Sequence, residues 1–331
     1  MSQSLQIKIS DCDQATLESR RKIIDSVEET TSKQTQWFEC ESAEDYRRMR
    51  REGTNRFPKP VLDANATTVI IASSHADHKI SLRRILPRNN APIKGVFLHF
   101  HAGGFVIGSA ASHDTLLGNI ATELSLVVVS VEYRLATEFV FPSMGEDCLD
   151  AALFALSDEG EKTLGGPLTF MGGESAGGYL TIWTAIRLRE RGIDVRKHIK
   201  ALAPTYGIFD LTYTSSVRAH KRRAVMGASD TFKYIDAAFP PSQFPFEERK
   251  KGIWSPLYDD LHDLPPAIFV VGTADPLLDD SVFMASKWSL AGNTAKLVIV
   301  PEAIHGFTLF PLGEITEEGN AEILSFLKQY I

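Results

Sequence analysis

Apolar and polar residues follow two alternating patterns from about residue 66 to the C-terminus. Short apolar runs that are rich in β-branched residues and end at Gly, Pro or polar residues predict strands. Longer segments with apolar residues at helical spacing predict helices between them. The expected strands are residues 66–73, 79–86, 94–100, 126–131, 168–172, 199–204, 267–272 and 295–300. The expected helices are residues 145–156, 176–191, 280–291 and 321–330.

This alternation of strands and helices is typical of an α/β fold with a mostly parallel central sheet of about eight strands and helices on both faces. Two regions break the alternation. Residues 1–55 are polar and helical in pattern, and residues 207–255 hold a basic run and an aromatic, proline-rich stretch. We expect the basic run to be a solvated helix face and the aromatic stretch to line a groove or pack locally. The chain is therefore predicted to have a main domain at 56–331, a helical cap or lid inserted at about 207–255, and an N-terminal helical segment, 1–55, in the same cap.

Composition and charge then narrow the function classes. The chain is 44% hydrophobic and 23% charged, which is typical of a globular protein. Its 42 acidic and 35 basic residues give a net charge of −7, which argues against a nucleic-acid partner. No run approaches the roughly 18 apolar residues of a membrane span, and the N-terminus lacks the apolar core of a signal peptide. Three cysteines without paired spacing favour a reducing compartment, so we expect a cytoplasmic location.

Common cofactor and metal motifs are absent from the sequence. No two glycines have the G-x-G spacing, no glycine precedes a lysine, and neither C-x-x-C nor H-E-x-x-H occurs. His99 and His101 could form a ligand pair on one side of a strand, but no acidic or thiol partner lies near them in the sequence. We therefore expect neither a cofactor nor a metal ion.

A short glycine-rich segment between the strand at 168–172 and the next helix carries the first candidate chemistry. Its sequence, Gly173-Glu174-Ser175-Ala176-Gly177, fits the G-x-S-x-G pattern of a nucleophilic serine on a sharp strand-to-helix turn. Bulky side chains at 173 and 177 would collide there, and the helix N-terminus behind Ser175 favours developing negative charge. The alternative is a glycine-rich turn whose serine merely caps the helix.

A second glycine-rich loop follows the strand at 94–100, with the sequence His101-Ala102-Gly103-Gly104-Phe105. Small residues at a strand end allow backbone N–H groups to approach an anionic oxygen. The amides of Gly103 and Gly104, together with that of Ala176, are the candidate oxyanion donors. A plain glycine turn is the alternative.

Six short blocks occur in a fixed order between residues 90 and 331. They are the loop at 101–105 (HAGGF), then 108–114 (GSAASHD), 133–138 (YRLATE), 173–178 (GESAGG), 275–279 (DPLLD) and 304–307 (IHGF). Together they resemble the hormone-sensitive-lipase-like branch of the α/β-hydrolases, whose corresponding motifs include HGGGF, YRLAPE and GDSAGG. Ala102, Thr137 and Glu174 depart from that pattern, but none of these departures removes a reacting group. The resemblance implies an α/β-hydrolase fold and hydrolysis of carboxylic esters with short to medium acyl chains.

The same order along the chain predicts the acid and the base of a catalytic triad. Asp275 and His305 each follow a predicted strand within a few residues, which places both at the carboxyl edge of the sheet. Asp279 and Asp280 are alternatives for the acid, but they open a helix and are more simply capping residues. For the base, His262 lies in an acidic loop and is expected to be solvated, while His113 is expected to support the oxyanion loop.

The sequence therefore predicts a serine hydrolase in which Ser175, His305 and Asp275 act through an acyl-enzyme intermediate on a small-molecule ester. The candidates for an apolar pocket wall, with core packing as the alternative, are Phe105, Tyr206, Ile208 and Phe209. One alternative function is a specialised-metabolite enzyme: a lactonase, thioesterase, acyltransferase, or lyase or cyclase on the same fold. The other is a non-catalytic ligand receptor. The sequence leaves open whether the chain forms a homodimer.

Overall fold

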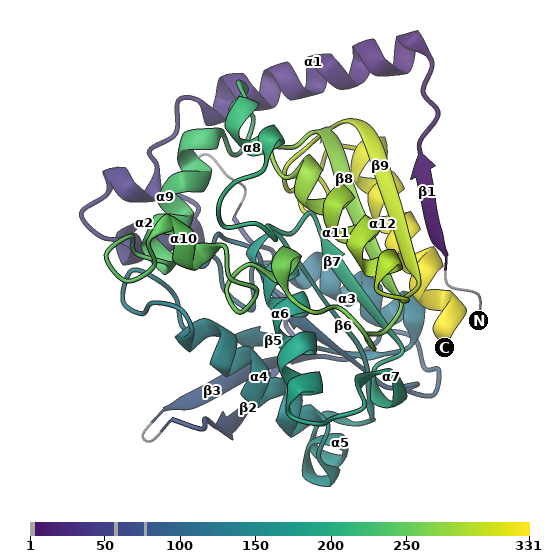
Figure 1. The fold of residues 1–331 in the computed structure, drawn as a ribbon. Coiled ribbons are helices and arrows are strands. Elements are labelled where there is room, and N and C mark those ends of the chain that lie inside the picture. The colour runs from purple at the N-terminus through teal and green to yellow at the C-terminus, as the bar shows by residue number, and fades with distance from the viewer. Residues whose placement is uncertain (1–3, 56–58, 76–77) are drawn as a thin grey trace.

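A nine-stranded sheet runs through the centre of the computed structural model, which describes residues 4–55, 59–75 and 78–331 (Figure 1). Its strand order is β1-β9-β8-β7-β6-β4-β5-β3-β2. All neighbours are parallel except β5 with β3 and β3 with β2, so the predicted mostly parallel α/β sheet is confirmed. The strands are β1 (Leu5–Ile9), β2 (Thr67–Ala72), β3 (Lys79–Ile85), β4 (Val96–Phe100), β5 (Val127–Glu132), β6 (Leu168–Glu174), β7 (Ala201–Thr205), β8 (Ala267–Ala274) and β9 (Ala295–Ile304).

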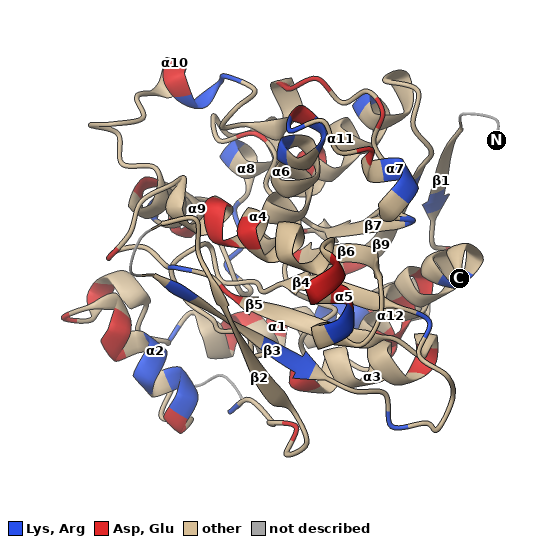
Figure 2. Ribbon diagram, turned by 90° about the horizontal axis from the view of Figure 1, so that it is seen from below, with Lys and Arg blue, Asp and Glu red and all other residues tan. Residues whose placement is uncertain are grey.

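Helices cover both faces of the sheet. Figure 2 shows α3 and α12 on one side of the strands and α6, α7 and α11 on the other. The α-helices are α1 (Gln14–Thr31), α2 (Ala43–Glu52), α3 (Asp114–Leu124), α4 (Ser143–Ala155), α5 (Asp158–Leu164), α6 (Ala176–Glu190), α7 (Val195–His198), α8 (Ser215–Ala219), α9 (Ala228–Ala238), α10 (Phe246–Arg249), α11 (Leu278–Leu290) and α12 (Glu314–Leu327). The central strands β4, β6 and β7 are fully buried, as expected for a parallel sheet between two helical layers.

The ninth strand corrects the prediction that residues 1–55 are helical throughout. Helices α1 and α2 do form there, but β1 is an edge strand that pairs in parallel with β9. Leu5, Ile7 and Ile9 alternate with polar residues as in a strand, although Ile7 and Ile9 are 59% and 62% exposed in this edge strand. Its hydrogen bonds come from β9, near the other end of the chain, which local sequence patterns do not reveal. Residues 1–3, and 56–58 at the predicted domain boundary, lie outside the described residues.

The N-terminal segment and the 207–255 insertion contact each other directly. Arg222 forms an ion pair with Glu28 of α1 at 2.7 Å, and the Thr31 hydroxyl donates to the carbonyl of Arg223 at 3.1 Å. The ring of Trp37 lies 5.6 Å from that of Tyr234 on α9. In Figure 1, α1 accordingly lies beside α8, with α2, α9 and α10 grouped at the same end of the molecule.

Asp280 on α11 ties the start of the insertion to the sheet layer. Its carboxylate accepts hydrogen bonds from the backbone N–H of Phe209 at 2.6 Å and of Asp210 at 2.9 Å, and from the Thr214 hydroxyl at 2.8 Å. Asp280 is fully buried, so without its carboxylate these donors would have no acceptor, because water does not reach them. The carboxylate thus fixes the point at which the chain leaves the sheet.

We expect Asp280→Ala to lower the free energy of unfolding by roughly 3 kcal/mol, because two buried N–H groups lose their acceptor. Urea unfolding of the wild type and the variant measures the difference. Asp280→Asn is the matched control, since its amide oxygen still accepts from both N–H groups. Equal losses in the two variants would show that the charge, rather than the acceptor, matters.

Candidate active site

Ser175 lies on the sharp turn between β6 and α6. Its backbone has φ 58° and ψ −115°, which is a strained conformation for a residue with a side chain. A Cβ atom at Gly173 would lie 2.2 Å from the Phe100 carbonyl oxygen, and one at Gly177 would lie 1.8 Å from it. Only glycine therefore fits on either side, because strand β4 passes directly against the turn.

His305 lies between Ser175 and Asp275 in a hydrogen-bonded chain. His305 Nε2 is 2.9 Å from Ser175 Oγ, and His305 Nδ1 is 3.0 Å from each carboxylate oxygen of Asp275. The three residues are at most 8% exposed. Because Nδ1 faces a carboxylate, the imidazole hydrogen lies there, and the Nε2 lone pair faces the serine hydroxyl. The arrangement can accept a proton from Ser175.

The alternative acids and bases lie elsewhere. Asp279 accepts from the backbone N–H of Ser216 at 2.8 Å, and Asp280 holds the insertion as described above. The His262 side chain is 71% exposed and pairs with Asp260. None of these aspartates or histidines contacts Ser175 within the described part of the chain.

Backbone hydrogen bonds within the predicted oxyanion loop hold it in a tight turn. The Gly103 carbonyl accepts from the N–H of Val106 at 3.0 Å and of Ile107 at 2.8 Å, and Gly103 and Gly104 have φ 131° and 59°. Ala102 is not among the residues with positive φ, so it tolerates its side chain. Among the described residues, no protein acceptor faces the N–H of Gly103, Gly104 or Ala176. These three donors remain available to a bound anion.

The pocket candidates fall in two groups. The Tyr206 ring lies 5.1 Å from the His305 ring, and its hydroxyl bonds Thr308 Oγ1, so it lies beside the hydrogen-bonded chain. The other three candidates pack in the interior: Phe105 against Tyr179 and Phe239, Phe209 against Phe269 of β8, and Ile208 with 3% exposure.

A contact that sequence analysis missed joins the insertion to the oxyanion loop. A Cβ atom at Gly104 would lie 2.3 Å from Cδ1 of Tyr234, so the tyrosine ring on α9 rests directly on this glycine. The two residues are far apart in the sequence, and nothing in the local pattern around Tyr234 indicates its position. The insertion therefore covers the loop that carries the candidate donors.

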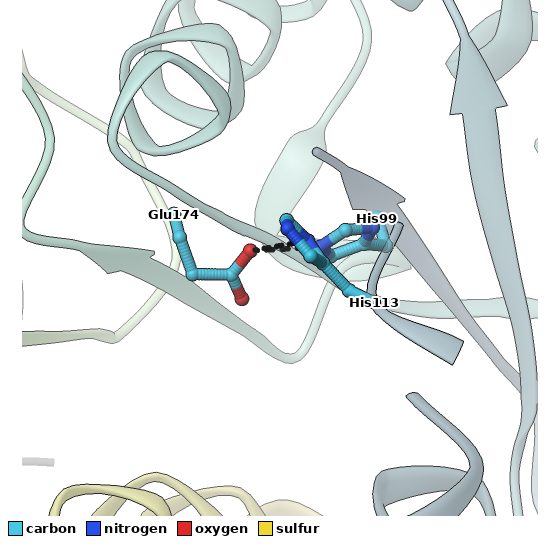
Figure 3. A group of neighbouring side chains, drawn as sticks. All are labelled: His99, His113 and Glu174. Carbon is cyan, nitrogen blue, oxygen red and sulfur yellow. Dashed lines mark hydrogen bonds and ion pairs between the residues drawn. The ribbon is translucent and has the colours of Figure 1, made fainter. Parts of the chain in front are cut away.

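One group within the described residues has the composition and spacing of metal ligands. The ligand atoms of His99, His113 and Glu174 lie within 4.8 Å of one another (Figure 3). The sequence had paired His99 with His101. Instead, the His101 ring stacks on Tyr133 at 4.0 Å, and burial lowers the His101 pKa to about 3. His99 and Glu174 already satisfy each other by a hydrogen bond of 3.0 Å, which requires no ion.

The strand–turn–helix site on this sheet defines a class of protein, the α/β-hydrolases, and comparison with known families agrees. The family model described as "alpha/beta hydrolase fold" matches residues 97–309. The chain belongs to this family, which confirms the resemblance predicted from its motifs.

No helix in the described ranges combines the length and apolar character that a membrane span requires.

The chain is similar to proteins with esterase names. It is 26% identical to an ethyl acetate hydrolase of Pseudomonas putida over 260 residues, which cover 77% of this chain and 80% of that protein. It is 26% identical to an esterase of Pyrobaculum calidifontis, with a TM-score of 0.72 over 96% of this chain and 94% of that one. A hormone-sensitive lipase from a metagenome library, 22% identical, shares the fold with a TM-score of 0.77 over 94% and 98% of the two chains.

Proposed function

We propose that this protein is a serine hydrolase that cleaves carboxylic esters with short to medium acyl chains. The observation that carries the proposal is the buried chain Asp275–His305–Ser175, with heavy-atom distances of 2.9 to 3.0 Å. The names of the relatives support the substrate class, because they describe hydrolases of ethyl acetate, aryl esters and other esters.

In the proposed reaction, Ser175 Oγ attacks the ester carbonyl carbon while His305 Nε2 takes the hydroxyl proton. His305 then gives that proton to the leaving alcohol, and the acyl group stays on Ser175 as an ester. A water molecule, deprotonated by His305, next attacks the acyl-enzyme and releases the acid. Asp275 holds the hydrogen of His305 on Nδ1 and stabilises the imidazolium that forms.

The amides of Gly103, Gly104 and Ala176 are proposed to bind the oxyanion of each tetrahedral intermediate. Each such donor contributes roughly 3 kcal/mol to the transition state. Ala176 is also the first residue of α6, so the partial positive charge of the helix N-terminus adds to the same site.

Residues 1–55 and 207–255 are proposed to act together as the cap over this site, although β1 within the first segment belongs to the sheet. Three contacts support a common cap: the Glu28–Arg222 ion pair, the Thr31–Arg223 hydrogen bond and the Trp37–Tyr234 ring contact. Since Tyr234 also rests on Gly104, the cap is placed to limit the space beside the oxyanion donors.

We expect Tyr234→Ala to favour longer acyl chains, because it removes the ring above Gly104. The ratio of kcat/KM for p-nitrophenyl octanoate to that for the acetate should rise about tenfold. Tyr234→Phe keeps the ring and serves as the control, with an unchanged ratio. An unchanged ratio in Tyr234→Ala would place the acyl chain on another side of the site.

A series of p-nitrophenyl esters from acetate to palmitate tests the proposed function, with Ser175→Ala as the control. Turnover of the short esters by the wild type alone supports a serine carboxylesterase. A wild-type protein that is labelled at Ser175 by a fluorophosphonate but hydrolyses no ester of the series would overturn the substrate class. It would favour a lactonase, thioesterase, acyltransferase or lyase instead. Failure to label Ser175 would favour a ligand receptor.

A further inference from the structure

A row of three polar side chains crosses three neighbouring buried strands next to the serine turn. His99 of β4 pairs in register with Ser130 of β5 on one side and with Gly172 of β6 on the other. Side chains alternate between the faces of a strand, so Glu174, two residues beyond Gly172, lies on the same face as His99. The row therefore connects β5, β4 and β6 inside the buried part of the sheet.

The row is hydrogen-bonded along its length. His99 Nδ1 lies 2.9 Å from Ser130 Oγ. On the other side, His99 Nε2 lies 3.0 Å from Glu174 Oε2, a contact drawn in Figure 3. His99 is fully buried and Glu174 is 5% exposed. The imidazole donates from Nε2 to the carboxylate, which accepts only, and Nδ1 accepts from the serine hydroxyl. Both nitrogens of His99 are thus used.

Glu174 keeps its negative charge in this setting. Burial favours the neutral acid, but the hydrogen bond that His99 donates holds the pKa of Glu174 below its ordinary value. His113 Nδ1 lies 3.6 Å from the same carboxylate oxygen, and burial lowers the His113 pKa to about 4. The carboxylate is therefore an anion near pH 7, and His113 is neutral.

The members of the row belong to the segments that build the proposed site. Glu174 directly precedes Ser175, and His99 lies two residues before the 101–105 loop that carries the proposed oxyanion donors. A bond between these two side chains links the strand of the nucleophile to the strand of the donor loop. Such a link fixes the distance between attacking and stabilising groups, on which the rate of an oriented reaction depends steeply.

We propose that Glu174 is a positioning residue that acts through its hydrogen bond to His99 and holds Ser175 in place relative to Gly103 and Gly104. This inference rests on the proposed ester hydrolysis and goes beyond it by assigning a role to the residue before the nucleophile. Glu174 touches neither substrate nor reacting atoms in this proposal. Its effect therefore falls on kcat rather than on KM.

The first test compares two truncations with one remote control. Glu174→Ala and His99→Asn each remove the bond, and each should lower kcat on p-nitrophenyl acetate by about 10- to 100-fold with KM within about threefold. Glu322→Ala removes a carboxylate that pairs with Lys296 at the start of β9, away from His305, and should leave kcat unchanged. Thermal unfolding of each variant shows whether it is folded, so that a lower kcat from a misplaced Ser175 is distinguished from unfolding.

Rescue and a double-mutant cycle distinguish positioning from a general packing effect. Glu174→Gln keeps the side-chain length and an oxygen that accepts from His99 Nε2, so kcat should recover to within about threefold of the wild type. The double variant Glu174→Ala with His99→Asn should lose no more than either single variant, because both remove the same bond. If one of the single variants does not fold, the rescue variant and the other single variant still test the inference.

Three results would overturn the inference. The first is a kcat of Glu174→Ala equal to that of the Glu322→Ala control. The second is losses that multiply in the double variant. The third is stoichiometric zinc in the purified wild type that Glu174→Ala lacks, which would make His99, His113 and Glu174 a metal site. Ester hydrolysis that survives in Ser175→Ala instead overturns the proposed function, so the two failures are distinguishable.

Discussion

The Ser175→Ala variant is expected to lose about 10⁵-fold or more in kcat on p-nitrophenyl acetate while it folds as the wild type does. The substitution removes the hydroxyl that lies 2.9 Å from His305 Nε2, which is the proposed nucleophile. Residues of such a triad act as a unit, and what remains is binding and stabilisation of the oxyanion. Alanine at φ 58° carries the same Cβ as serine, so the turn is no more strained than before.

The measurement is kcat for both proteins, together with thermal unfolding and intact mass after treatment with a fluorophosphonate. The wild type should gain one adduct and the variant none. Ser281→Ala is the matched control: it removes another fully buried hydroxyl, on α11, which has no hydrogen-bond partner among the described residues. It should keep full activity and the adduct. Full hydrolysis by Ser175→Ala would mean that another residue is the nucleophile.

The sequence predicted eight of the nine strands from local apolar runs, and strands β4 to β8 are buried along most of their length. Strand β1 was missed because it is only five residues long within a polar segment and its partner β9 is almost 300 residues away. The tight turn around Ser175 was predictable for a different reason. Gly173 and Gly177 mark places where a backbone passes too close for a side chain, and the Phe100 carbonyl is that backbone.

The order of residues along the chain predicted Ser175, Asp275 and His305, which the structure joins by hydrogen bonds, but not the bonds that the alternative aspartates make. Three aspartates lie within six residues after β8, at 275, 279 and 280. Asp279 and Asp280 lie in the first turn of α11 and accept hydrogen bonds from the insertion. Asp279 bonds Ser216, and Asp280 bonds Phe209 and Thr214. The partners of Asp279 and Asp280 had no signal in the sequence, because they come from a segment more than 60 residues away.

Contacts around the site that depend on distant segments had no signal in the sequence. Tyr234 meets Gly104 only because the insertion folds back over the sheet. His99 meets Glu174 because β4 and β6 are neighbours in the sheet although they are 75 residues apart in the chain. Strand order is a tertiary property, so side-chain pairs across it follow from topology and not from local pattern.

The Asp275→Asn variant is expected to lose about 10⁴-fold in kcat near pH 7, with the fold retained. Asp275 Oδ1 accepts from the backbone N–H of Leu277 at 2.8 Å, and an asparagine would keep its oxygen at that donor. The amide NH2 would then replace Oδ2, which lies 3.0 Å from His305 Nδ1. Oδ1 also lies 3.0 Å from Nδ1 and can still accept from it, but the neutral amide no longer stabilises the imidazolium, and its NH2 group disfavours a hydrogen on Nδ1. Nε2 therefore accepts the proton of Ser175 much less readily.

The matched control is Asp279→Asn, the same chemical change four residues further along the chain. Asp279 bonds Ser216 N and not His305, so kcat should stay within about threefold of the wild type. Steady-state kinetics on p-nitrophenyl acetate measures both variants, and urea unfolding shows whether each is folded. A large loss in Asp279→Asn together with full activity in Asp275→Asn would assign the acid to Asp279. Losses that are equal in both variants would mean that the helix start as a whole positions His305. The proposed tautomer mechanism requires the loss in Asp275→Asn alone.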